Sequence, residues 1–200
     1  MASVHMIKPV RSEVEARPKY TDYRASLRKD FNNSCGYCDD SDARTETVLF
    51  HIDHFAPKKK FPALATTYGN LVYACRFCNI RKSDHWISED ADKPNNTVKG
   101  FVDPCSSDYD NHLDRTADGR IVAITPLGSY MIGRLHLNLL RHELLWKARR
   151  ARAIQVEISI LIDALKDTGK QESKEAINLL WRFYELSKAI EAYELGAIHG

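Results

Sequence analysis

The sequence predicts an α+β fold in which a small zinc-bound module is followed by a mainly helical C-terminal extension. Two Cys-x-x-Cys pairs, Cys35/Cys38 and Cys75/Cys78, are the first observation, because two short loops that each deliver two thiolates commonly build a zinc site. The second is the order strand, loop, strand, helix, in which the helix begins at the later pair. The third is a spacing of three or four between apolar residues beyond residue 131, which is typical of amphipathic helices.

Local patterns predict the elements of the module. Tyr23, Leu27 and Phe31 recur every four residues and indicate a short helix. Two segments rich in β-forming residues flank a basic loop over residues 58–69, and a second short helix begins at the later cysteine pair. The expected elements are helix 20–32, strands 47–52 and 71–74, and helix 76–83. A module this small buries only a small hydrophobic core, so a bound metal ion is expected to stabilise its fold.

The rest of the chain is assigned in the same way. Residues 84–120 are polar loops, with strands expected at 98–102 and 120–125. Beyond them one apolar stripe runs through Leu137, Leu140, Leu144, Ala148, Ala151, Ile154, Ile158, Leu161 and Leu165. Gly169 ends that helix, and a last helix is expected over 171–197. Its inward side chains are expected to be Ile177, Leu180, Trp181 and Tyr184, and Trp86 and Trp146 are expected in the core.

The chain is expected to have four parts. These are a flexible N-terminal tail (1–19), the module with its four-cysteine zinc site (20–90), a loop and hairpin connection (91–130), and a helical extension packed on the module (131–200). A length of 200 residues suits one domain, or a small domain with an extension.

The composition argues against several classes of protein. With 44% hydrophobic residues a core can form, and no run approaches the roughly 18 apolar residues of a membrane span. The first residues lack the apolar segment of a secretory signal, so a cytoplasmic setting is expected. There, paired cysteines more often bind metal than form disulfides. The fifth cysteine, Cys105, is expected to be a buried or half-buried thiol.

Between the cysteine pairs lies the segment His51-Ile52-Asp53-His54, and Asn79 follows the last cysteine directly. An acid, an amide and a histidine are groups that can hold a second, harder metal ion and activate a water molecule. The alternative is a structural zinc knuckle that carries an incidental histidine.

The net charge of +2 is uninformative, but its distribution is not. The stretch from His54 to Lys82 contains six basic residues and no acidic one, a field that favours a polyanion beside the site. The six are Lys58, Lys59, Lys60, Arg76, Arg81 and Lys82. Ordinary solvated loop and helix charges remain the alternative. A second basic cluster, in residues 141–152, is better explained as the polar face of a helix.

Together, residues 51–58, the Gly69-Asn70 turn with its strand, and Cys75-Arg76-Phe77-Cys78-Asn79 with its Lys82 ending resemble the HNH endonucleases. The branch they resemble is the zinc-stapled prokaryotic one. The resemblance covers about a quarter of the chain and implies a ββα-metal, treble-clef-like module.

The resemblance also implies roles. It makes His54 the general base, since a neutral imidazole suits that task near neutral pH. It makes Asp53 and Asn79 the ligands of one divalent ion, and two oxygen ligands favour Mg²⁺ or Mn²⁺. Asn70 would fix the loop and orient the base. His51 matches no essential family position. In a regular strand it would share a face with Asp53 and could touch metal or substrate, but a packed strand histidine is the expectation we favour. Asp53 and His54 can serve one site only if the strand ends or twists there.

Three functions compete. The first is a metal-dependent nuclease that cuts DNA and leaves 5′-phosphate and 3′-hydroxyl ends, as the family resemblance implies, with RNA not excluded as substrate. The second is a non-catalytic zinc module that binds nucleic acid. The third is a subunit whose helical extension docks onto a partner ATPase, or forms a homodimer, in antiphage defence.

Overall fold

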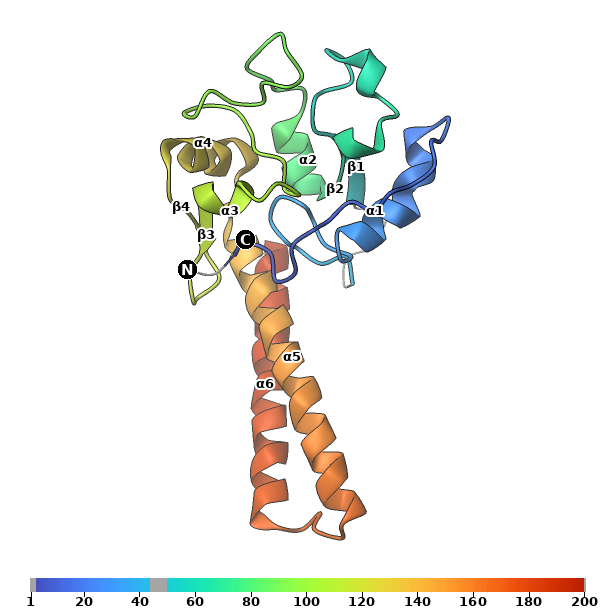
Figure 1. Cartoon of the computed structure of the whole chain (residues 1–200). Coiled ribbons are helices and arrows are strands. Elements are labelled where there is room, and N and C mark those ends of the chain that lie inside the picture. The colour runs from blue at the N-terminus through green and yellow to red at the C-terminus, as the bar shows by residue number, and fades with distance from the viewer. Residues whose placement is uncertain (1–2, 44–49, 200) are drawn as a thin grey trace. The chain divides into compact units, whose positions relative to one another are not determined.

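The computed structural model describes residues 3–43 and 50–199 (Figure 1). The chain divides into two compact units, Met1–Leu139 and Leu140–Gly200. The first combines short strands with helices and holds the clustered cysteines, and the second is helical. The expected α+β class is therefore confirmed. The finer division into four parts stays a prediction.

A hairpin followed by a helix forms the centre of the first unit. Strand β1 (Phe50–His54) pairs antiparallel with β2 (Leu71–Cys75), and α2 (Arg76–Lys82) follows without a break. The register sets Phe50 opposite Cys75 and His54 opposite Leu71. All of β2 is buried, which agrees with its continuous run of apolar residues. Residues 47–49 of the first expected strand lie outside the described residues.

Helix α1 (Arg24–Asp30), preceded by a 3-10 helix (Tyr20–Tyr23), comes before the hairpin in the sequence (Figure 1). Tyr23, Leu27 and Phe31 are buried, so the expected apolar stripe is confirmed. Asn32 and Asn33 end the helix with positive φ angles of 53° and 55°, a conformation that asparagine tolerates better than most residues. The chain then enters the loop that carries the first two cysteines.

Four short elements follow the hairpin and its helix: α3 (Tyr109–His112), β3 (Leu113–Arg115), β4 (Ile121–Ala123) and α4 (Pro126–Leu135). The strand expected at 120–125 is confirmed as β4, which pairs with β3. The strand expected at 98–102 is wrong, since this stretch makes only an isolated bridge between Asn95 and Gly100. Helix α4 was not separately expected, although Thr125 caps it and Pro126 begins it.

The second unit is a pair of long helices, α5 (Leu140–Asp167) and α6 (Lys174–His199), which lie side by side in Figure 1. Gly169, with a φ of +71°, lies in the turn that joins them, as expected. Ala148, Ala151 and Ile190 form the buried seam, with Leu186 and Tyr193 packed against them.

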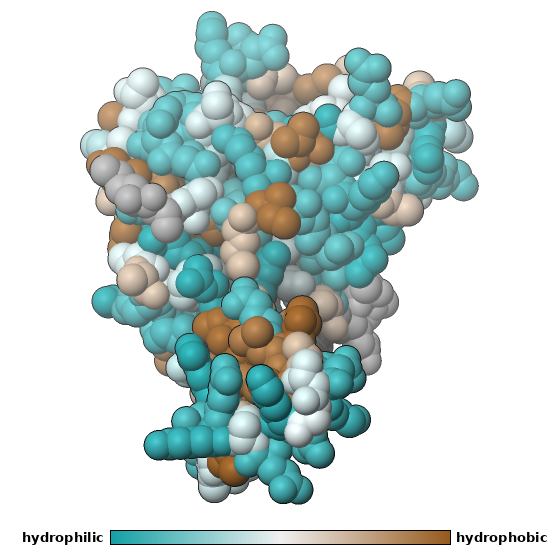
Figure 2. Space-filling view, turned by 60° about the horizontal axis from the view of Figure 1, so that its bottom comes forward, coloured by the Kyte–Doolittle hydropathy of each residue, from teal (hydrophilic) through white to brown (hydrophobic). Residues whose placement is uncertain are grey.

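The inward face expected for the last helix is wrong. Ile177, Leu180, Trp181 and Tyr184 are all exposed, and Trp181 is 62% exposed. Helix α6 carries two apolar stripes, and the one that packs with Ala148 and Ala151 of α5 contains Leu186, Ile190 and Tyr193. Figure 2 shows hydrophobic side chains exposed among hydrophilic ones on the surface of the protein. We call the four exposed residues the α6 stripe.

None of the helices in the described ranges combines the length and apolar character that a membrane crossing requires.

Candidate active site

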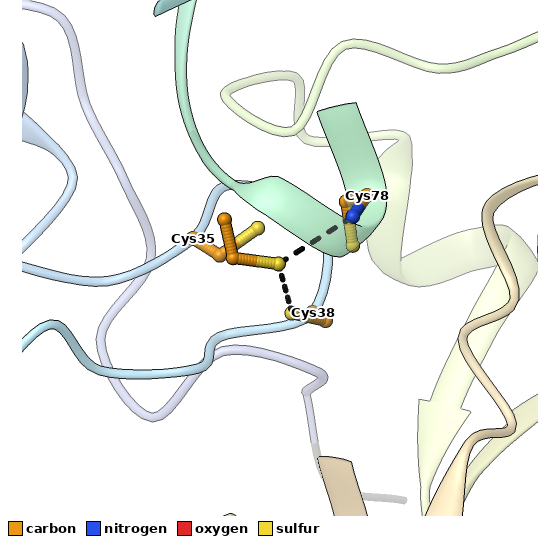
Figure 3. A group of neighbouring side chains, drawn as sticks. Cys35, Cys38 and Cys78 are labelled. Atoms are coloured by element: carbon orange, nitrogen blue, oxygen red, sulfur yellow. Dashed lines mark hydrogen bonds between the residues drawn. The ribbon is translucent and has the colours of Figure 1, made fainter. Parts of the chain in front are cut away.

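The four paired cysteines come together in the fold as a zinc site requires. Cys35, Cys38, Cys75 and Cys78 are buried, and their sulfur atoms all lie within 4.8 Å of one another (Figure 3). The sulfurs of Cys38 and Cys75 are 3.7 Å apart. This is far beyond a disulfide bond of about 2 Å. It matches the edge of about 3.8 Å expected for a tetrahedron with Zn–S bonds of about 2.3 Å. The donor set therefore fits a structural zinc ion.

The end of β1 brings the acid and the histidine into one site. Neighbours in an extended strand point to opposite faces. Here β1 ends at His54, and both Asp53 and His54 line a cavity of about 480 Å³. Asn79, from the first turns of α2, lines the same cavity, as does the basic residue Lys58. The three polar groups singled out in the sequence therefore share one space.

Hydrogen bonding determines which nitrogen of His54 is available as a base. Its Nε2 lies 2.9 Å from the carbonyl oxygen of Ala65, which can only accept a hydrogen bond. Nε2 must therefore carry the proton, and Nδ1 keeps its lone pair. The ring of Tyr20 contacts the imidazole edge-on, with centroids 4.8 Å apart. Burial lowers the pKa of His54 more than the Ala65 bond raises it, and Lys58 lowers it further, which favours the neutral ring.

Asn70 ties together the backbone around His54. Its Oδ1 accepts from the backbone N–H of Ala56 at 2.7 Å, and its Nδ2 donates to the carbonyls of Ala56 at 3.0 Å and Leu64 at 3.2 Å. Ala56 lies two residues after His54, and Leu64 precedes the residue whose carbonyl binds the imidazole. The amide thus holds both segments that set the position of the ring, while its own atoms do not line the cavity.

Asp53 is buried and strongly held. Its Oδ2 accepts from the hydroxyl of Tyr37 at 2.6 Å and lies 3.1 Å from the Nζ of Lys82. Burial raises the pKa of Asp53, although Lys82 and Tyr37 oppose this by favouring the charged carboxylate. Burial and the Asp53 charge raise the pKa of Tyr37, so its hydroxyl keeps its proton and donates. Within the described part of the chain, Oδ1 of Asp53 has no hydrogen-bond partner.

Asn79 is oriented by the histidine at the start of the motif. Its Nδ2 lies 2.8 Å from Nδ1 of His51, so the amide donates and the ring accepts. Among the residues that the structure describes, Oδ1 of Asn79 has no partner either. The cavity is thus lined by two residues, Asp53 and Asn79, that each keep an unpaired oxygen. Hard oxygen donors of this kind suit Mg²⁺ or Mn²⁺, so the residues present fit such an ion.

The six basic residues expected to contact DNA differ in their surroundings. Arg76 and Arg81 on α2 are exposed, and Lys58 lies 4.7 Å above the ring of Tyr20. Lys59 and Lys60 are paired with Asp84 at 3.4 Å and Glu89 at 2.6 Å, acids that lie just beyond the segment free of acidic residues. Lys82 is fully buried, because it compensates the Asp53 charge. The expected contact of Lys82 with DNA is therefore wrong, since none of its surface is exposed.

Two tyrosines of the site were not anticipated from the sequence. Tyr37 stands inside the first Cys-x-x-Cys pair and binds Asp53, and Tyr20 lies against His54. Both are distant in sequence from their partners and belong to no periodic pattern. The position of Tyr37 between two zinc-type cysteines was the one available signal.

Comparison with known proteins agrees with this geometry. Residues 35–85 match the family model for the HNH endonuclease. A stretch of 76 residues is 33% identical to the Septu protein PtuB of Bacillus thuringiensis, covering 35% of this chain and 29% of that protein. The chain thus matches less than a third of the length of that relative. No solved structure matches the chain significantly. Together with the hairpin, its helix and the clustered cysteines, the family match shows that this chain carries an HNH endonuclease domain at residues 35–85.

Proposed function

We propose that the protein is a metal-dependent endonuclease that hydrolyses phosphodiester bonds in DNA. The observation that carries the proposal is the cavity that joins a neutral His54, whose Nδ1 is left as a base, to Asp53 and Asn79. Hydrolysis of a phosphodiester requires a water that loses a proton as it attacks, and a cation that neutralises the charge developing on the phosphate.

In this proposal each residue has a defined task. His54 takes the proton of the attacking water on Nδ1, and its bond to Ala65 keeps the ring in the required tautomer. Asn70 holds the loop that supplies this carbonyl. Asp53 and Asn79 would hold the divalent ion through their unpaired oxygens. When bound, Mg²⁺ or Mn²⁺ supplies the positive charge that the phosphate and the leaving 3′ oxygen need, with 5′-phosphate and 3′-hydroxyl products.

The basic rim of the cavity supports a polyanionic substrate. Lys58 lines it, as does Lys59 in its pair with Asp84, and Arg81 is exposed on the adjoining helix. Phosphate contacts of this kind position a strand without reading its sequence. DNA is the substrate that we propose, and the cleavage assay below includes RNA to test this choice.

A non-catalytic zinc module that binds nucleic acid is the rival function. Such a module gains nothing from a histidine whose tautomer is set by a carbonyl, or from the shared cavity with Asp53 and Asn79. These features favour the hydrolase.

The likeness to a Septu protein supports including a role in antiphage defence in the proposal. The α6 stripe supports a protein contact, because contiguous exposed apolar residues often mark interaction sites. Whether the partner is an ATPase or a second copy of this chain stays a prediction.

A cleavage assay tests the proposal. Supercoiled plasmid, linear duplex and single-stranded RNA are incubated with the zinc-loaded protein and Mg²⁺ or Mn²⁺. We expect nicking of DNA by the wild type and the exposed-histidine control His85→Ala, and none by His54→Ala or in EDTA. Undiminished nicking by His54→Ala would remove the base assignment, and cleavage of RNA alone would change the substrate.

A further inference from the structure

The zinc site has two arms: the loop with the first cysteine pair, and helix α2 with the second. Each arm places a hydrogen-bond donor beside the same carboxylate oxygen, Oδ2 of Asp53. Tyr37 belongs to the first cysteine loop, and its hydroxyl lies 2.6 Å from Oδ2 of Asp53. Lys82 stands one helical turn after Cys78 on α2, and its Nζ lies 3.1 Å from the same oxygen. The carboxylate is therefore held between the two segments that the cysteines would join through zinc.

The first arm is rigid at the backbone level. Three successive carbonyls of the loop each accept a bond from a different part of the chain: that of Gly36 from His5 at 2.6 Å, that of Tyr37 from Tyr109 at 2.7 Å, and that of Cys38 from Arg115 at 2.7 Å. The N–H of Gly36 also donates to the carbonyl of Tyr73 on β2 at 2.8 Å. The backbone that carries the Tyr37 side chain has almost no freedom to move.

The Tyr37 side chain is equally confined. It is fully buried, and its neighbour Gly36 is packed so closely that an added Cβ would lie 2.7 Å from the ring of Phe31 and 2.8 Å from Val72. The hydroxyl therefore reaches Asp53 from a backbone and a side chain that are both fixed by packing.

The second arm is fixed by a different set of contacts. The Nζ of Lys82 donates to the backbone carbonyl of His54 at 2.8 Å, in addition to its pairing with Asp53. Its ammonium group also lies over the rings of Phe55 at 6.0 Å and Phe101 at 5.7 Å. Lys82 thus holds the end of β1, but its positive charge also opposes the binding of a cation at Asp53.

We propose that Tyr37 is the positioning residue that links the zinc site to the catalytic carboxylate. Its hydroxyl holds Oδ2, and Oδ1 is thereby directed to the cavity shared with Asn79. This inference rests on the proposed role of Asp53 as a ligand of the divalent ion. Without the hydroxyl, only Lys82 holds the carboxylate, and the pairing with this cation competes with the divalent ion.

Tyr37→Phe removes one oxygen atom and keeps the ring. Tyr73→Phe is a matched control, because Tyr73 is also buried and donates to a carboxylate, Asp42, at 2.7 Å, away from the cavity. Binding of Mn²⁺ to the full-length, zinc-loaded protein is measured by titration calorimetry without nucleic acid, beside zinc content and thermal unfolding. A hydrogen bond to a charged group contributes enough that its loss should weaken Mn²⁺ binding about tenfold or more.

The expected result is one zinc per chain in every variant, with weaker Mn²⁺ binding in Tyr37→Phe alone. In an Asp53→Asn background, Tyr37→Phe should have no further effect on Mn²⁺ binding. Wild-type affinity in Tyr37→Phe, an equal loss in Tyr73→Phe, or no Mn²⁺ binding by the wild type would each overturn the proposal.

A second pair of variants tests the same role of Tyr37 if Tyr37→Phe folds poorly. At position 37, 4-aminophenylalanine keeps a donor, whereas 4-methylphenylalanine fills the same space without one. We expect only the first to retain Mn²⁺ affinity, and equal affinities would contradict the positioning role. A wild type that binds Mn²⁺ as described but cleaves no nucleic acid would contradict the proposed function and still support the role of Tyr37.

Discussion

Replacement of Lys82 by methionine tests how the buried charge at the site is compensated. Lys82 is fully buried, and its removal leaves the Asp53 carboxylate buried without its cation. Removing one partner of a buried ion pair typically costs about 3–5 kcal/mol. This is a large part of the roughly 5–15 kcal/mol that stabilises an ordinary domain. In a domain of this size it lowers the melting temperature by roughly 10 °C.

The assay is urea unfolding of the zinc-loaded protein, followed by circular dichroism, with two further variants. Lys59→Met is the matched control, because the Lys59 side chain is 84% exposed and its pairing with Asp84 should contribute less than about 1 kcal/mol. Lys82→Met combined with Asp53→Asn should regain much of the stability, since the asparagine is neutral and keeps an acceptor for Tyr37. A cost below about 1 kcal/mol for Lys82→Met would show that Lys82 does not compensate a buried charge, as would a double variant no more stable than the single one.

Three further predictions concern the zinc site and the helical pair. Chelation of zinc should unfold the module and expose the four thiols of the zinc site to a thiol reagent. Cys105, whose pKa burial raises to about 12, should react slowly in the native protein. Four fast-reacting thiols before chelation would contradict this. Gly36→Ala should cost about 1–3 kcal/mol in thermal unfolding, because the new Cβ meets Phe31 and Val72; an unchanged melting temperature would show that the loop can relax. Trp181→Ala should change helical stability by no more than about 0.5 kcal/mol, whereas Ile190→Ala should cost about 2 kcal/mol or more. The reverse order would mean that the α6 stripe faces inward.

Much of the module's structure could be predicted from the sequence, because the patterns that specify it span only a few neighbouring residues. Four cysteines at metal-binding spacing predicted their clustering, and two short strand-forming segments predicted the hairpin. The helix after it was expected to begin at the second cysteine pair, as it does. The strand expected at 98–102 failed because Gly100, with a φ of +115° and the Pro94 carbonyl packed against its Cα, supports a turn-like bridge instead.

The remaining features depend on contacts that no local pattern encodes. Lys82 reads as a surface charge at the end of a basic helix, and only its pairing with Asp53 across the hairpin explains its burial. Tyr37 and Tyr20 reach the site from segments far away in sequence. On α6, two apolar stripes have the same helical spacing, so periodicity alone cannot choose which of them faces α5.

The most direct measurement for the nuclease account is chemical rescue of His54→Gly. Loss of a general base typically lowers the cleavage rate about 10²–10⁴-fold, and the cavity beside residue 54 has room for a small base. We expect added imidazole to restore DNA cleavage by His54→Gly in proportion to the neutral form of imidazole, and to have no effect on Asp53→Ala. Full activity of His54→Gly without imidazole would contradict this account.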